Sequence, residues 1–131
     1  MFRKKTQLSS LEWEVMHTIW QAEKPVTVRE VLERAYPEGG KAYTTIQTVM
    51  NHLVEKGFLK REKIGLVNFY EPLKSREETL EKELQNFARV TFGGSMTALA
   101  NFLIDSDALS PEEIQQLKQL IEAKMGKEPS Q

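Results

Sequence analysis

One run of the chain, from Thr44 to Gly57, carries polar side chains of the kinds that proteins use to contact DNA. At helical spacing its apolar residues fall on one face, and the opposite face carries Thr44, Thr45, Gln47, Thr48, Asn51 and His52. A solvated helix face usually carries pairs of Glu and Lys, whereas this face is nearly uncharged. Amides pair with adenine in the major groove, and threonine contacts the thymine methyl group. The run is therefore predicted to form a DNA-contacting recognition helix that stops at Gly57.

The position of a side chain along this helix suggests what it contacts. Thr44 and Thr45 lie near the first turn, where helix N-termini attract phosphate, so they contact either phosphate or bases. Gln47 and Thr48 lie further in and are the favoured base readers. Tyr43 precedes the run, and it either reaches phosphate through its hydroxyl or packs against the turn.

The residues after this helix predict a β-hairpin. Two short runs rich in β-forming residues, 58–63 and 66–70, flank a turn at Ile64-Gly65. Three basic residues on the first run are candidates for phosphate contacts: Lys60, Arg61 and Lys63. For any one of them, a solvated strand edge is the alternative. A polar helix followed by a basic hairpin is the arrangement of a winged helix-turn-helix, and a generic helix-plus-hairpin domain is the other possibility.

Two capping boxes predict the helices that support this surface. Ser9-x-x-Glu12 opens a first helix and Thr27-x-x-Glu30 opens a second, with Pro25-Val26 breaking the chain between them. Val26 is also placed to pair briefly with the wing. Thr44-x-x-Gln47 has the same spacing, so it is predicted to cap the third helix.

The carboxyl-terminal part predicts three more helices. They start at Ser75, Ser95 and Ser110-Pro111, and Gly93-Gly94 separates the first of them from the second. The expected fold is mainly α with a small β-hairpin. It comprises a winged helix-turn-helix DNA-binding domain at residues 1–74 and a helical dimerisation region at residues 75–131.

These last three helices carry more apolar surface than so short a segment can bury by itself. They either pack back on the winged domain or pair with a second copy of the chain. The dimer is favoured because helical DNA readers usually bind two half-sites about one duplex turn apart. The predicted interface comprises Leu84, Phe87, Leu99, Phe102, Leu103, Ile114, Leu117, Leu120 and Ile121.

Composition excludes several functions. The chain has no cysteine and only two histidines, so disulfides and thiolate metal sites are excluded, and we expect no metal and no cofactor. We expect no enzyme either, because no nucleophile–base pair and no phosphate-cradling loop is present. No stretch is apolar for long enough to span a membrane, which predicts a cytoplasmic protein.

The charge is unevenly divided along the chain. Residues 1–74 hold 12 basic and 9 acidic residues, a balance of +3, whereas the remainder holds 6 and 10, a balance of −4. The amino-terminal part is therefore the half expected to face phosphate. Arg3, Lys4 and Lys5 are expected to add a loose basic arm.

With these motifs in place, the sequence resembles the BlaI/MecI/CopY family of bacterial repressors, which includes the penicillinase repressors. The matching runs are Leu8–Met16 with Ile19-Trp20, Ala42–Thr48, Leu53–Leu59 and Tyr70–Pro72, so the resemblance covers essentially the whole chain. It implies a homodimeric winged-helix repressor that binds double-stranded, inverted-repeat operator DNA. His52 departs from the family, which often has Arg there, so this phosphate contact is expected to be weak or pH-dependent.

The resemblance also implies how such a repressor is released. Copper-responsive members carry cysteine pairs near the carboxyl end, which this chain lacks. The β-lactam-responsive members are inactivated by proteolysis at an Asn-Phe bond, which Asn101-Phe102 matches, and the implied partner is a membrane sensor-protease. A purely structural role for these two residues, release by another signal, and a winged-helix protein-interaction module remain the alternatives.

Overall fold

The computed structural model describes residues 7–127 of the chain. The predicted basic arm at Arg3, Lys4 and Lys5 lies outside the described residues. Six helices and two strands follow one another in the order α1, α2, α3, β1, β2, α4, α5, α6 within the described part. The chain divides into two compact units, Met1–Glu83 and Leu84–Gln131. The division falls inside α4, and the functional boundary expected at residue 74 stays a prediction.

The first two helices start as their capping boxes predict. In α1 (Ser10–Ala22) the amide of Glu12 donates to the Ser9 hydroxyl, and the Ser9 amide donates to the Glu12 carboxylate. In α2 (Val28–Ala35) Thr27 and Glu30 make the same two bonds. Each box satisfies amide groups that the first turn would otherwise leave unpaired.

Helix α3 (Tyr43–Glu55) confirms that the predicted helix forms over this run but corrects its start. Its N-cap residue is Ala42, which makes no side-chain capping bond, so the predicted cap at Thr44 and Gln47 is wrong. The helix ends as expected at Gly57, whose φ is 86°. The amide of Phe58 donates back to the Leu53 carbonyl at 2.9 Å, which satisfies a carbonyl of the last turn.

A single apolar core holds α1, α2, α3 and the hairpin together. Fully buried side chains come from every one of these elements, among them Met16, Val31, Ile46, Met50, Leu53, Leu59 and Tyr70. Val26 and Tyr70 exchange two backbone bonds of 2.9 and 2.8 Å, which confirms the short pairing predicted for Val26. The segment between α1 and α2 is thereby fixed to the hairpin.

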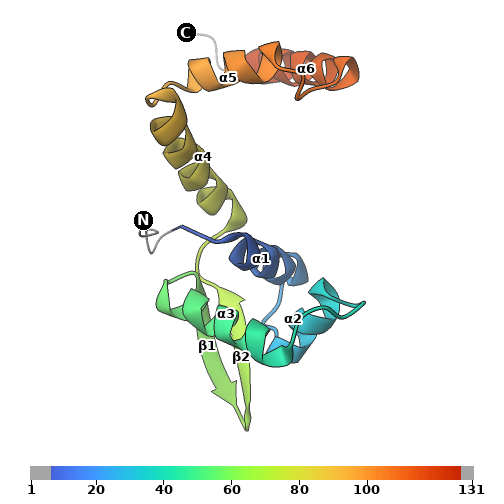
Figure 1. The fold of residues 1–131 in the computed structure, drawn as a ribbon, viewed down its shortest axis with the longest axis vertical. Helices are drawn as coiled ribbons and strands as arrows, with labels where there is room; N and C mark the ends of the chain where they lie inside the picture. The colour runs from blue at the N-terminus through green and yellow to red at the C-terminus, as the bar shows by residue number, and fades with distance from the viewer. Residues whose placement is uncertain (1–6, 128–131) are drawn as a thin grey trace. The chain divides into compact units, whose positions relative to one another are not determined.

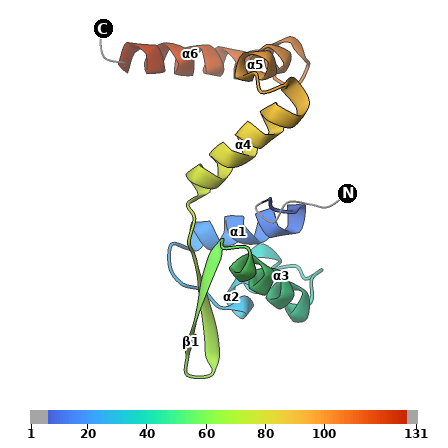
Figure 2. The same cartoon turned by 90° about the vertical axis from the view of Figure 1, so that its left-hand side faces the viewer.

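The hairpin consists of β1 (Leu59–Ile64) and β2 (Val67–Pro72), paired antiparallel with Arg61 opposite Tyr70. Its turn is at Gly65-Leu66, one residue later than expected. The strands extend beyond the three helices that support their base, so the hairpin forms a projecting wing (Figures 1 and 2).

The second unit comprises the end of α4 (Arg76–Phe92), α5 (Met96–Asp105) and α6 (Pro111–Lys127). Among its described side chains only Ala88 is buried. The ring of Phe92 lies 6.2 Å from that of Phe87 and 5.8 Å from that of Phe102, centroid to centroid. This aromatic contact joins α4 to α5 across the Gly93-Gly94 break.

Candidate nucleic-acid interface

The outer face of α3 is presented by the core beneath it. Ile46, Met50 and Leu53 are wholly buried, and they fix the rotation of the helix about its axis. The opposite face carries exposed Tyr43, Thr44, Thr45, Thr48 and His52, together with half-buried Gln47 and Asn51. The predicted contact residues of this helix therefore lie on one polar surface. Hydroxyl and amide groups on such a surface can bond base edges and phosphate oxygens.

The hairpin sorts its basic residues onto two faces. Side chains alternate along a strand, so Arg61 and Lys63 share one face while Lys60 lies on the other. Arg61 contacts α3 through Asn51, with Nη1 donating to Oδ1 at 2.7 Å. The structure thus brings Arg61 and Lys63 to the side of the recognition helix.

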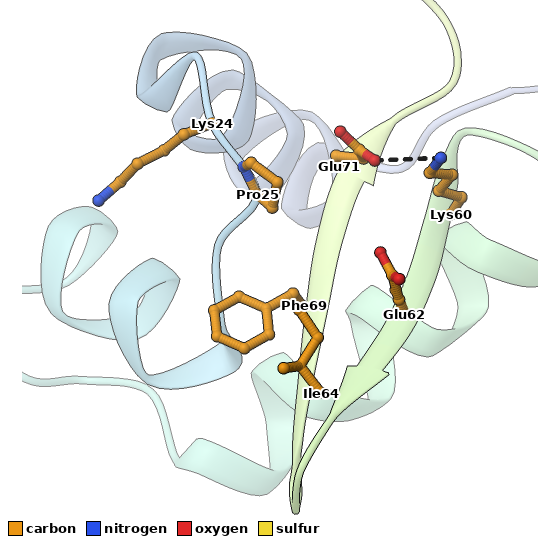
Figure 3. Close-up of a pocket in the computed structure, with 7 residues that line it drawn as sticks. All are labelled: Lys24, Pro25, Lys60, Glu62, Ile64, Phe69 and Glu71. Carbon is orange, nitrogen blue, oxygen red and sulfur yellow. Dashed lines mark ion pairs between the residues drawn. The ribbon is translucent and has the colours of Figure 1, made fainter.

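Lys60 lies on the far face of the hairpin. Its Nζ forms an ion pair with Glu71 at 3.2 Å, and the two residues face each other across the strands (Figure 3). This face lines a cavity of about 270 Å³ formed by Lys24, Pro25, Lys60, Glu62, Ile64, Phe69 and Glu71. Lys60 is therefore separated from the other two predicted wing contacts.

Asn51 has partners within the protein that sequence spacing did not indicate. Besides the Arg61 bond, its Oδ1 accepts the hydroxyl of Tyr70 at 2.8 Å. Burial raises the pKa of the Tyr70 phenol, and the nearby Arg61 charge opposes that rise. The phenol is therefore a neutral donor at physiological pH. Both acceptor positions of the Asn51 oxygen are filled, which leaves only its NH₂ group for DNA.

Arg29 is a further basic residue at this surface that the sequence analysis missed. Its guanidinium lies 5.1 Å from the ring centroid of Tyr43, the residue that opens α3. Arg29 is exposed and occupies the first turn of α2, where the helix dipole disfavours a cation. Glu30 occupies the same first turn, and nothing in the type or spacing of Arg29 distinguishes it in the sequence from a solvated surface residue.

Between these elements lies an open cavity of about 330 Å³. It is lined by Thr27, Val28, Arg29, Tyr43, Gln47, Leu66, Val67, Asn68 and Tyr70. Residues of α2, α3 and the wing therefore border one polar depression beside the recognition helix.

No group of three His, Asp or Glu side chains is placed to hold a metal ion in residues 7–127. Over the same residues, no helix combines the length and apolar character needed to cross a membrane.

The comparisons with known proteins agree with this geometry. The penicillinase repressor family matches the chain over residues 8–123. The chain belongs to the penicillinase repressor family. The predicted resemblance is therefore confirmed, as is the prediction of a regulator and not an enzyme, because this is a family of repressors.

Individual members of the penicillinase repressor family are similar along their whole length. The methicillin resistance regulatory protein MecI of Staphylococcus aureus is 28% identical over 124 residues, which are 95% of this chain and 100% of that protein. The penicillinase repressor of Bacillus licheniformis is 30% identical over 120 residues, which are 92% of this chain and 93% of that protein.

A solved structure supports the winged-helix fold of the first unit. The solution structure of the DNA-binding domain of the repressor BlaI is 31% identical, with a TM-score of 0.50. The matched region covers 59% of this chain and 93% of the BlaI domain. The predicted fold class, mainly α with a small β-hairpin in a winged helix-turn-helix domain, is confirmed.

Proposed function

We propose that this chain is a homodimeric transcriptional repressor that binds an inverted-repeat operator through its winged helix. The observation that carries the proposal is that two surfaces lie side by side on one compact unit. The polar, uncharged outer face of α3 lies beside the face of the wing that carries Arg61 and Lys63. The first surface suits base edges in a major groove, and the second suits the phosphates that flank it.

Most of the site residues keep the roles expected from their positions. Gln47 and Thr48 read bases, Thr44, Thr45 and Tyr43 contact phosphate or bases near the start of α3, and His52 lies one turn further along. Arg61 and Lys63 contact phosphate from the wing, and Arg29 joins them. Lys60 has the weaker case because it faces away from α3.

The second unit supports the dimer. Large apolar side chains of α5 and α6 are exposed in the single chain, with Phe102 at 62%, Leu120 at 65% and Ile121 at 55%. So much unburied apolar surface marks an interaction site. A second copy is the occupant that the proposed function requires, because two half-sites need two recognition helices. Bivalent binding multiplies operator affinity without new contacts.

Release of the repressor by proteolysis at Asn101-Phe102 is part of the proposal. Both residues are exposed on α5, a helix of 10 residues that follows two glycines in the left-handed region, Gly93 and Gly94. A protease needs locally opened backbone, and a short helix after such a break opens at low cost. The cut would detach Phe102 and the whole of α6 from the DNA-binding unit. The partner would be a membrane sensor with a protease domain in the cytoplasm.

Selection from a randomised duplex library with the full-length protein tests DNA recognition. We expect enrichment of an inverted repeat whose half-site centres are separated by about one or two helical turns. Sedimentation velocity should show a dimer at micromolar concentration. Enrichment of no sequence would contradict the proposal and favour a protein-interaction module, and an obligate monomer would contradict the dimeric part.

Co-expression with a candidate sensor-protease tests the release. N-terminal sequencing of the carboxyl-terminal product should give Phe102 as its first residue, and Asn101→Pro should prevent the cut. A product that starts elsewhere would place the release site at another bond, and an uncut protein that still leaves its operator would indicate a different signal.

A further inference from the structure

The Asn51 amide is the one point at which the recognition helix is bonded to both strands of the wing in the described structure. Arg61 donates to its Oδ1 from β1, and Tyr70 donates to the same atom from β2, at 2.7 and 2.8 Å. A guanidinium can only donate, so the oxygen and not the nitrogen of the amide must face it. The bidentate pairing of Asn with adenine needs that oxygen as an acceptor, and here it is already saturated.

Tyr70 holds the Asn51 side chain in place. Its side chain is fully buried, and its backbone is held from the other side by the two bonds with Val26. The phenol therefore lies within the core, and its hydroxyl donates to Asn51 from a fixed position. Tyr70 itself is too deeply buried to touch DNA.

Arg61 is the solvent-accessible partner in this arrangement. It is exposed, and no carboxylate among the described residues forms an ion pair with it. One of its five N–H donors is used on Asn51, so Nε and Nη2 stay available to a phosphate. A guanidinium already held in place loses less rotamer freedom when it binds.

We infer that Asn51 is a positioning residue and not a base reader: it fixes the Arg61 guanidinium beside the recognition helix for a phosphate contact. This inference rests on the proposed DNA-binding function. It predicts that Asn51 acts on DNA only through Arg61. Its effect should then be insensitive to DNA sequence, because phosphate contacts carry no sequence information.

A double-mutant cycle on a random-sequence duplex tests the inference. Affinities of the full-length protein are measured by fluorescence anisotropy for the wild type, Asn51→Ala, Arg61→Ala and the double variant. We expect Asn51→Ala to weaken binding on the order of threefold to tenfold, the usual net worth of one such hydrogen bond. The double variant should bind no more weakly than Arg61→Ala alone. Independent losses that multiply in the double variant would overturn the inference, since Asn51 would then contact DNA itself.

Tyr70→Phe is a second test of the inference, because it removes a hydrogen-bond donor to Asn51 without altering the exposed surface. We expect a twofold to fivefold loss of duplex affinity, on the order of part of one hydrogen bond. The matched control is Tyr36→Phe, which removes a tyrosine hydroxyl that donates to Glu14 and not to a residue of α3 or the wing. An equal effect of both variants would indicate general destabilisation and overturn the inference.

A measurement without DNA separates this inference from the proposed function. Nitrogen-15 relaxation of the Arg61 side chain should show an ordered Nε–H group in the free wild-type protein and a mobile one in Asn51→Ala. If the wild type binds no duplex at all, the proposed function fails, and these order parameters still decide whether Asn51 holds Arg61. A mobile Arg61 in the wild type would overturn the inference.

Discussion

Nζ of Lys56 lies 2.7 Å from Oε1 of Glu12, in an ion pair whose side chains are only 18% and 8% exposed. The same Nζ donates to the Gln7 carbonyl at 3.0 Å, and the Ser9 amide donates to the same Glu12 oxygen at 2.7 Å. The carboxyl end of the recognition helix is thus bonded to the segment that starts α1. The orientation of α3 depends on this polar contact as well as on the apolar core.

Removing the cation of this pair should destabilise the first unit. Lys56→Met leaves the Glu12 carboxylate buried without its partner, and we expect the free energy of unfolding in urea to fall by about 2–4 kcal/mol. Lys24→Met is the control, because Lys24 pairs with Glu30 at 3.7 Å on the surface and should cost under about 0.5 kcal/mol. Equal losses for the two variants would mean that burial of the Lys56 pair has no energetic consequence.

The same carboxylate should make stability depend on pH. Desolvation acts to raise the pKa of Glu12, but the bonds from Lys56 and Ser9 outweigh it and hold the pKa below the ordinary value of 4.5. A carboxyl whose pKa is lower in the folded state stabilises the fold above the unfolded pKa and loses that contribution as the pH falls. The unfolding free energies of the wild type and Glu12→Gln should therefore differ most above pH 4.5 and converge below it. A gap that stays constant down to the acid transition would contradict this prediction.

Replacement of Gln47 should separate sequence reading from general DNA attraction. We expect Gln47→Ala to weaken binding to the selected operator by about 1–3 kcal/mol and to leave random duplex nearly unaffected, because a base contact is lost. Competition binding assays measure both. Gln21→Ala, on α1 and bonded to His17, is the matched control and should change neither. Equal losses on the two duplexes would assign Gln47 to the phosphate backbone.

Neighbouring basic residues of β1 should behave differently because strand alternation separates them. Arg61→Ala should flatten the plot of log affinity against log salt concentration by about 0.9, the slope contribution of one phosphate contact. Lys60→Ala, on the far face and paired with Glu71, should leave the slope unchanged. If the two variants were interchangeable, the wing would attract DNA only through its overall charge.

A charge on α6 should break the proposed dimer without unfolding the helix. Ile121 is on the apolar stripe with Ile114 and Leu117, and Ile121→Asp is expected to cost about 2 kcal/mol or more of association free energy. Gln119→Asp adds the same charge to the opposite side of the same helix and should leave the dimer intact. Sedimentation equilibrium measures the association, and circular dichroism verifies that the helices remain.

Much of this fold is predictable because its start signals are local. Capping boxes start four of the helices, at Ser9, Thr27, Ser75 and Ser110. In each box two residues that are three positions apart share two hydrogen bonds, so the spacing of the residue types alone locates the helix start. The start of α3 was misplaced because Ala42 caps it without a side chain, while Thr44 and Gln47 imitate the spacing of a cap. Spacing indicates that a capping bond can form, not that it does.

The site was harder to predict because its decisive contacts are distant in sequence. Asn51 meets Tyr70 and Arg61 only after the hairpin folds back on α3, so its place on the polar face indicated a contact with DNA and not these partners within the protein. The separation of Lys60 from Arg61, in contrast, follows from strand alternation and needs no tertiary information. The predicted contacts with DNA and the predicted dimer interface stay predictions.

The short pairing of Val26 with Tyr70 has a consequence for solubility. It covers one side of β2, so in the part of the chain that the structure describes β1 has the free backbone edge of the sheet. That edge strand carries Lys60, Arg61 and Lys63 against a single carboxylate, Glu62, and Lys and Arg on an edge strand disfavour its pairing with a strand of another molecule. Edge-to-edge association of two wings through β1 is therefore disfavoured.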